Sequence, residues 1–91
     1  TIADGLLTSL SDLTFGIIRD RVARILTVPE DAIIDAMRFV YERAKIVIEP
    51  SAAVGLAALF AREPDHRGLN NGIIICGGNV DLDRLPWQRP A

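Results

Sequence analysis

The residues most able to do chemistry lie between Ile73 and Asp83. They read IIICGGNVDLD: an apolar run leads into Cys76, two glycines and Asn79. A strand that ends in glycines is typical of a phosphate-binding turn, but this segment lacks the G-x-G-x-x-G pattern of dinucleotide sites and the G-K-[ST] of P-loops. The glycines by themselves therefore indicate a tight turn with a positive φ, which glycine tolerates.

Cys76 is the only cysteine of the chain. A single cysteine excludes an intrachain disulfide and every multi-cysteine metal motif, and it is typical of a reducing compartment, so we expect a cytoplasmic protein. A nucleophilic cysteine needs a nearby base, whereas a free cysteine is most often a small buried hydrophobe. The only histidine, His66, lies in a charged loop. We therefore do not expect a Cys–His hydrolase.

Three carboxylates could form an acid–base group. Asp81 and Asp83 flank Leu82 in a turn, where aspartates more often cap the backbone or face solvent. Glu49 differs, because it lies among apolar residues and directly before Pro50, where the backbone avoids helical angles. Since a buried carboxylate without a partner is costly, we expect Glu49 to have a hydrogen-bonding role, either structural or catalytic.

Composition limits the partners. The chain has 91 residues, of which 49% are hydrophobic, and a net charge of -2; this is one small domain or a piece of a larger one. Basic and acidic residues are interspersed, so we expect neither nucleic acid nor a membrane surface as a partner. The longest apolar run, from Ala52 to Ala61, is only about half a membrane span, and no leader pattern opens the chain.

Hydrophobic periodicity predicts the elements that position these residues. Residues 1–9 have no period and are expected to be a loop, residues 13–21 a short helix, and residues 24–28 a strand before Pro29. Residues 29–45 carry the clearest helical pattern, with acidic residues at the start and basic residues at the end. The apolar face of this helix contains Ile33, Ile34, Met37, Val40, Tyr41 and Ala44.

The second half of the chain adds one more helix and one more strand. Residues 51–61 are small and apolar all round, which predicts a helix buried on most sides within a larger body. Residues 62–72 are predicted to be a polar loop and residues 73–76 a buried strand, followed by a tail without another element. The order helix, strand, helix, helix, strand indicates an α/β class with parallel strands.

Four stretches taken together resemble a known enzyme family. They are TIADG (1–5), LTFGIIRDRV (13–22), AMRFVYERAKIVIEPSAAVGLAAL (36–59) and CGGNVDLD (76–83). In this order they are similar to the C-terminal end of the serine/threonine dehydratase and serine racemase family, fold-type-II enzymes that depend on pyridoxal phosphate. The resemblance implies that residues 1–91 are a C-terminal fragment of the large catalytic domain, with helices packed on a short parallel sheet and no regulatory domain.

The resemblance also implies which residues bind the cofactor. In that family the residue before the double glycine points its side chain at the pyridine nitrogen, and here that residue is Cys76. Most relatives with GGNVD have serine at this place, although mammalian-type serine dehydratases have cysteine. The other cofactor-binding residues implied by the family's motifs are Gly77, Glu49 and Gly5. A neutral thiol leaves the ring nitrogen largely unprotonated, which favours loss of a β-hydroxyl over reactions that need a stronger electron sink.

The resemblance implies that the rest of the machinery lies elsewhere. The family's Schiff-base lysine, phosphate-binding loop and metal-binding carboxylates lie upstream of TIADG. The only lysine here, Lys45, does not match the Schiff-base position. We therefore expect no catalytic residue and no metal ligand in this chain, no activity from the chain alone, and a partner in the N-terminal part of the same enzyme.

The implied activity of the whole enzyme is that of an ammonia-lyase in a homodimer or higher homo-oligomer. It would convert a small hydroxy amino acid, threonine or serine, to a 2-oxo acid and ammonia. Alternatives within the family are a serine racemase and a hydroxyaspartate dehydratase. Lys45 and Asn79 match positions that contact a nucleotide effector in serine racemases, although a helix-end cation and a turn residue would explain them equally. A non-catalytic assembly fragment is the alternative of another class.

Overall fold

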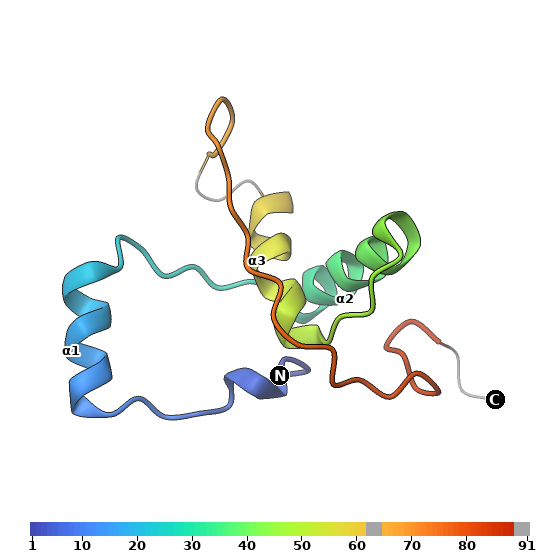
Figure 1. Ribbon diagram of the computed structural model, residues 1–91, viewed down its shortest axis with the longest axis horizontal. Coiled ribbons are helices and arrows are strands. Elements are labelled where there is room, and N and C mark those ends of the chain that lie inside the picture. Colours follow the sequence, from blue (N-terminus) through green and yellow to red (C-terminus); the bar gives the residue numbers. More distant parts are fainter. Residues whose placement is uncertain (62–64, 89–91) are drawn as a thin grey trace.

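The computed structural model describes residues 1–61 and 65–88. In these ranges it contains three α-helices: α1 (Asp12–Arg21), α2 (Glu30–Phe39) and α3 (Pro50–Phe60) (Figure 1). A 3₁₀ turn, η1, covers Asp4–Leu6, and a π-helical turn, η2, covers Val40–Ala44 and continues α2. Extended segments join these elements.

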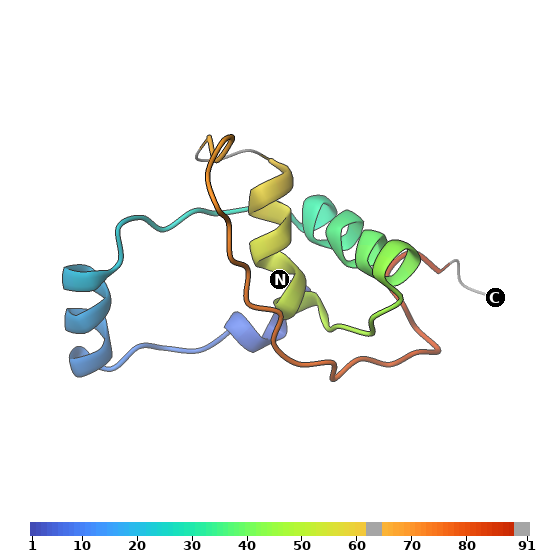
Figure 2. The same cartoon turned by 45° about the horizontal axis from the view of Figure 1, so that its top comes forward.

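Helix α1 begins at a complete capping box. The Ser11 hydroxyl accepts a hydrogen bond from the Thr14 N–H at 3.2 Å, and the Thr14 hydroxyl accepts one from the Ser11 N–H at 3.0 Å. Two otherwise unpaired N–H groups are thereby satisfied, which confirms the helix predicted at residues 13–21. Figures 1 and 2 show α1 standing apart from the other helices, and its apolar residues are exposed, Leu13 by 73%.

Helix α2 and its π-helical continuation confirm the helix predicted at residues 29–45. Pro29 is the N-cap, and two acidic residues lie in the first turn at the positive end of the helix dipole. The helix ends at Lys45, which has a left-handed conformation with φ of 59°. On its apolar face Ile33, Met37 and Val40 are buried as predicted, with Ala36 beside them, whereas Ala44 is exposed.

Helix α3 confirms the helix predicted at residues 51–61 and packs against α2. Its buried residues, Ala52, Ala53 and Ala57, are all small, which lets the two helix backbones approach closely. The opposite side of α3 is more open, because Gly55 is exposed. The core consists of Ala3, Ile33, Ala36, Met37, Val40, Ile48, Ala52, Ala53 and Ala57.

The predicted parallel sheet is absent from the described residues, and this prediction was wrong for the chain as it stands. Residues 24–28 and 73–76 belong to no strand. Ile25 is 76% exposed and Ile74 is 85% exposed, so neither segment has a neighbour on both sides. A strand exists only when a second strand pairs with its N–H and C=O groups, and no such partner is present within these ranges.

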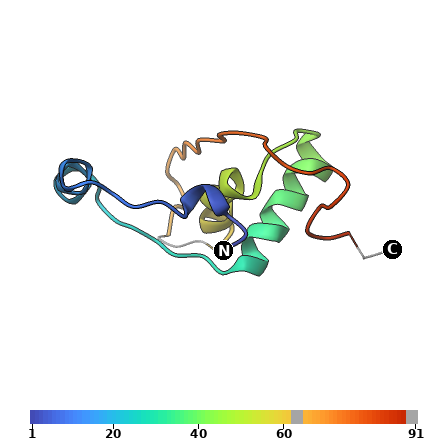
Figure 3. The ribbon, with the colours of Figure 1, turned by 90° about the horizontal axis from the view of Figure 1, so that it is seen from below.

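Two loop predictions are confirmed in part. Residues 65–72 contain turns and no regular element, and residues 62–64 and 89–91 lie outside the described ranges. The predicted loop at residues 1–9 contains the short turn η1, which lies beside the N-terminal end of α3 in Figures 1 and 3. No helix of the described ranges is long and apolar enough to cross a membrane.

Met37 tests the packing of α2 on α3, because it is fully buried at their interface. Met37→Ala in the full protein should lower the free energy of unfolding by about 2 to 5 kcal/mol, through lost transfer energy and the cavity left behind. Met37→Leu is the control and should cost less than about 1.5 kcal/mol, since it nearly conserves volume. Urea unfolding measures both, and equal losses would contradict tight packing here.

Candidate functional site

Three segments far apart in the sequence meet at the N-terminal end of α3. The Glu49 N–H donates to the Gly77 carbonyl at 3.3 Å, and the Asn79 N–H donates to Oε2 of Glu49 at 2.9 Å. The Gly5 N–H donates to the Ser51 hydroxyl at 3.0 Å. We call Gly5, Glu49, Ser51, Gly77 and Asn79 the Glu49 cluster. It brings together three of the four predicted cofactor-binding residues.

Glu49 is held in place by the chain on both of its sides. It is the N-cap of α3 with an extended conformation, φ −86° and ψ 163°, as expected before Pro50. On the other side Ile48 is buried, and its carbonyl accepts a hydrogen bond of 3.0 Å from the Tyr41 hydroxyl. The Tyr41 ring meets Trp87 edge to face, with centroids 5.0 Å apart. Burial raises the pKa of Tyr41, so its hydroxyl stays a donor at neutral pH.

The two glycines after Cys76 are needed for different reasons. Gly77 has φ of +79°, which confirms the predicted positive φ, and a Cβ there would lie 2.9 Å from the Cδ and both oxygens of Glu49. Gly78 is instead limited by space, because a Cβ would lie 3.1 Å from the Val47 carbonyl oxygen. Residues 47–49 and 77–79 therefore run close together, which the sequence did not indicate.

Gly5 lies on another side of the same carboxylate. A Cβ on Gly5 would lie 2.8 Å from the Ser51 Oγ and 3.9 Å from Oε1 of Glu49. Glu49 thus lies between two glycines, and a side chain on Gly5 would displace Ser51. Ser51 was not among the residues predicted from the sequence. The available signal was a hydroxyl residue in the first turn of α3, where such side chains bond to backbone N–H groups.

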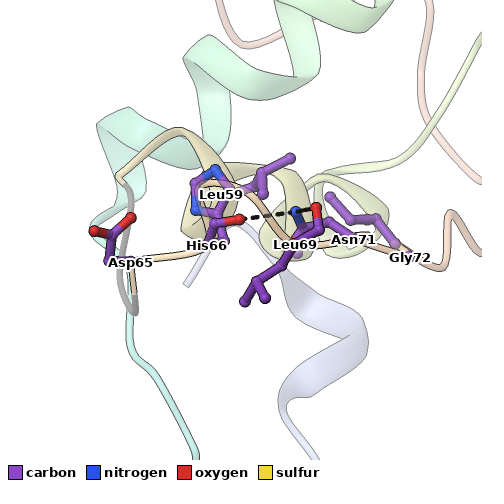
Figure 4. Close-up of a pocket in the computed structure, with 8 residues that line it drawn as sticks. Leu59, Asp65, His66, Leu69, Asn71 and Gly72 are labelled. Atoms are coloured by element: carbon purple, nitrogen blue, oxygen red, sulfur yellow. Dashed lines mark hydrogen bonds between the residues drawn. The ribbon is translucent and has the colours of Figure 1, made fainter.

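Cys76 directly precedes the cluster, and its free thiol is exposed. His66 is not part of this site. It lies in a separate hollow of about 210 Å³ between α3 and the loop after it, with Leu59, Leu69 and Asn71 among the lining residues (Figure 4). The Asn71 side chain donates to the backbone carbonyls of His66 at 3.3 Å and Leu69 at 3.0 Å. These bonds close the loop on itself through the backbone of His66.

The remaining candidate residues lie in turns or on the surface. The Asp83 N–H donates to Oδ1 of Asp81 at 2.9 Å, which confirms the turn-capping interpretation for Asp81, whereas Asp83 is exposed to solvent. Lys45 is exposed where η2 ends, and Asn79 is exposed while its backbone N–H reaches Glu49. Across residues 1–61 and 65–88, no group of three His, Cys, Asp or Glu side chains is placed to hold a metal ion.

Comparisons with known proteins identify the family of the chain. The model of a family described as pyridoxal-phosphate dependent enzyme matches residues 1–77. The chain is 45% identical over 88 residues to beta-hydroxyaspartate dehydratase of Paracoccus denitrificans, covering 97% of this chain and 28% of that protein. It superposes on serine racemase from Dictyostelium discoideum with a TM-score of 0.82 and 52% identity, covering 90% of this chain and 27% of that one. For a threonine deaminase from T.th. the TM-score is 0.74, with 39% identity over 89% of this chain and 30% of that one. The chain therefore spans less than a third of the length of these relatives.

Gly77→Ala in the full protein tests the close approach of Glu49. Gly68 is a matched control, because it has a similar φ of +77° but a Cβ there meets nothing within 4 Å. Both variants carry the strain of a left-handed alanine, about 1 to 2 kcal/mol. Gly77→Ala should lower the melting temperature further, since it also displaces the Glu49 carboxylate. Equal shifts in the two variants would contradict the contact.

Proposed function

The chain belongs to the family of pyridoxal-phosphate dependent enzymes of fold type II, and we propose that it is the C-terminal part of the catalytic domain of an enzyme that acts on small hydroxy amino acids. The family match over residues 1–77 carries this proposal. Relatives whose names describe dehydratases, deaminases and racemases support it. The N-terminal part of the same enzyme is then the first partner of this chain, within a homodimer or higher homo-oligomer.

The residues at the Glu49 cluster suit the ring of the cofactor better than its phosphate. Cys76 offers an exposed thiol directly before the turn. None of the five cluster residues is a cation, and the one charged side chain, Glu49, would repel a phosphate. We therefore assign Cys76 to the pyridine nitrogen. Gly77, Glu49 and Gly5 would form the adjoining wall, and the phosphate would be bound outside this chain.

The reaction type follows from the chemistry of that thiol. When bound, pyridoxal phosphate would supply an electron sink for the α-carbon of an amino acid, which is the chemistry that loss of an α-proton and a β-hydroxyl requires. The Cys76 S–H is a weak donor and brings no charge to the ring nitrogen. A moderate electron sink favours elimination, so the leading activity is dehydration of threonine or serine to a 2-oxo acid and ammonia.

Two other activities are supported by the relatives themselves. The names of the matched proteins include a serine racemase at 52% identity and a hydroxyaspartate dehydratase at 45% identity. Incubation of the full enzyme with threonine, serine and 3-hydroxyaspartate would separate them. Release of 2-oxo acid and ammonia identifies a dehydratase and its substrate, and chiral analysis of serine identifies a racemase. A cofactor-loaded enzyme that turns over none of these amino acids would overturn the proposal.

The chain alone should not bind the cofactor covalently. Its only lysine, Lys45, lies exposed at the end of η2, does not match the family's Schiff-base position and takes no part in the hydrogen bonds of the Glu49 cluster. Co-expression with the N-terminal part should give a yellow complex. A stable, colourless complex would favour a non-catalytic assembly fragment instead.

Replacement of Cys76 tests the role of the thiol in the full enzyme. Because the S–H bond is weak, Cys76→Ser should retain the cofactor and keep elimination activity within about tenfold, which corresponds to about 1.4 kcal/mol. Cys76→Asp should protonate the ring nitrogen and shift the products from elimination toward racemisation or transamination. Steady-state rates and product analysis measure both. Unchanged activity in Cys76→Ala would show that the side chain does not face the cofactor.

Lys45 and Asn79 form a second candidate site, for a nucleotide effector between subunits. If they bind it, ATP with magnesium should change the activity and melting temperature of the full enzyme, and Lys45→Asn should weaken that response. Asparagine tolerates the left-handed conformation of this position. Arg43→Ala is the control, because it removes another exposed cation from the same turn. An enzyme that does not respond to ATP would leave Lys45 as a helix-end cation and Asn79 as a turn residue.

A further inference from the structure

We propose that Glu49 is a positioning residue: its carboxylate braces the turn from Cys76 to Asn79 through the backbone and so aims the Cys76 thiol, without acting as a charged partner of the cofactor. The consequence for the thiol rests on the function proposed above. The brace itself rests only on contacts within this chain, so the two can be tested separately.

The brace has two points of attachment on one residue. The backbone N–H of Glu49 bonds to the carbonyl of Gly77 at 3.3 Å, and its side-chain Oε2 accepts the N–H of Asn79 at 2.9 Å. The two bonds span the Gly77–Gly78–Asn79 backbone. The side-chain bond is the shorter of the two attachments.

The turn needs an external brace because it contains two consecutive glycines. Glycine populates positive and negative φ about equally, so Gly77 and Gly78 do not define a conformation by themselves. Gly77 is nevertheless found at φ of +79°, with its Cα directly against the Glu49 carboxylate. Because Cys76 is joined to Gly77, any release of this residue would also change the direction of the thiol.

The geometry assigns the carboxylate an acceptor role in which the oxygen matters more than the charge. A glutamine at position 49 has the same length and still offers a carbonyl oxygen to the Asn79 N–H. An alanine offers neither an acceptor nor the volume that packs on Gly77. An aspartate is one methylene shorter. Glu49→Gln should therefore preserve the turn, whereas Glu49→Ala and Glu49→Asp should release it.

The first experiment measures amide hydrogen exchange of Asn79 in the full protein without cofactor. Exchange should be about tenfold faster in Glu49→Ala, because the Asn79 N–H loses its hydrogen-bond acceptor, and close to wild type in Glu49→Gln, which keeps an acceptor oxygen. Glu30→Ala is the matched control, because Glu30 also accepts a backbone N–H, that of Ile2 at 2.7 Å, but belongs to another element. It should leave Asn79 exchange unchanged. Unchanged exchange in Glu49→Ala would overturn the brace.

The second experiment uses the cofactor-loaded enzyme and separates bracing from a charged contact. Under the proposal, Glu49→Gln retains the absorption band of the bound cofactor and the pH profile of kcat. Glu49→Ala should lower kcat and cofactor affinity, each by about tenfold, because the turn that aims Cys76 loses its side-chain hydrogen bond. If Glu49→Gln changes the absorption band or pH profile as much as Glu49→Ala does, the carboxylate acts by its charge and the proposal is wrong. Faster Asn79 exchange in a protein that binds no pyridoxal phosphate would support the brace and overturn the proposed function.

Discussion

One carboxylate determines the local structure on which the candidate site depends. Glu49 packs between Gly5 and Gly77 and accepts the N–H of Asn79, so it joins three segments that are remote in the sequence. Neither neighbouring glycine could carry a side chain without displacing Glu49 or Ser51. The glycines of the site are thus explained by the residues they face within the chain, before any ligand is considered.

The packing of α2 against α3 holds the segment that carries Glu49 in place. Small buried residues on α3 allow the helices to approach, and the same packing buries Ile48 immediately before Glu49. The Tyr41 hydroxyl then bonds to the Ile48 carbonyl at 3.0 Å and closes the connection between the helices. The packed pair of helices therefore fixes the point at which the extended segment ends at Glu49 and α3, which carries Ser51, begins. The helices thus position the residues of the site, and the glycine-rich turn keeps the site accessible.

Other parts of the chain expose apolar side chains that the described residues do not cover. Helix α1 stands apart, and the apolar side chains of Leu13, Ile25 and Ile74 are largely exposed. Burial of such residues is the main favourable term in folding, so their exposure here matches a chain that covers less than a third of the length of its relatives. The same observation explains the missing sheet. Periodicity can identify a segment that suits a strand, but the strand forms only where a partner offers its backbone groups.

The sequence by itself determined the helices and the family. The helical period with its proline and acidic start predicted α2 and its continuation, because those signals act within a few turns of one helix. The motifs around Glu49 and Cys76 were sufficient to identify the pyridoxal-phosphate dependent family, and the residue type of Gly77 permits the positive φ that the structure shows. Only the tertiary structure decided that Glu49 faces Gly77 and Asn79, and that Ser51 bonds to Gly5. These contacts join residues 30 and 46 positions apart, and patterns that act within a few turns of one helix do not encode them.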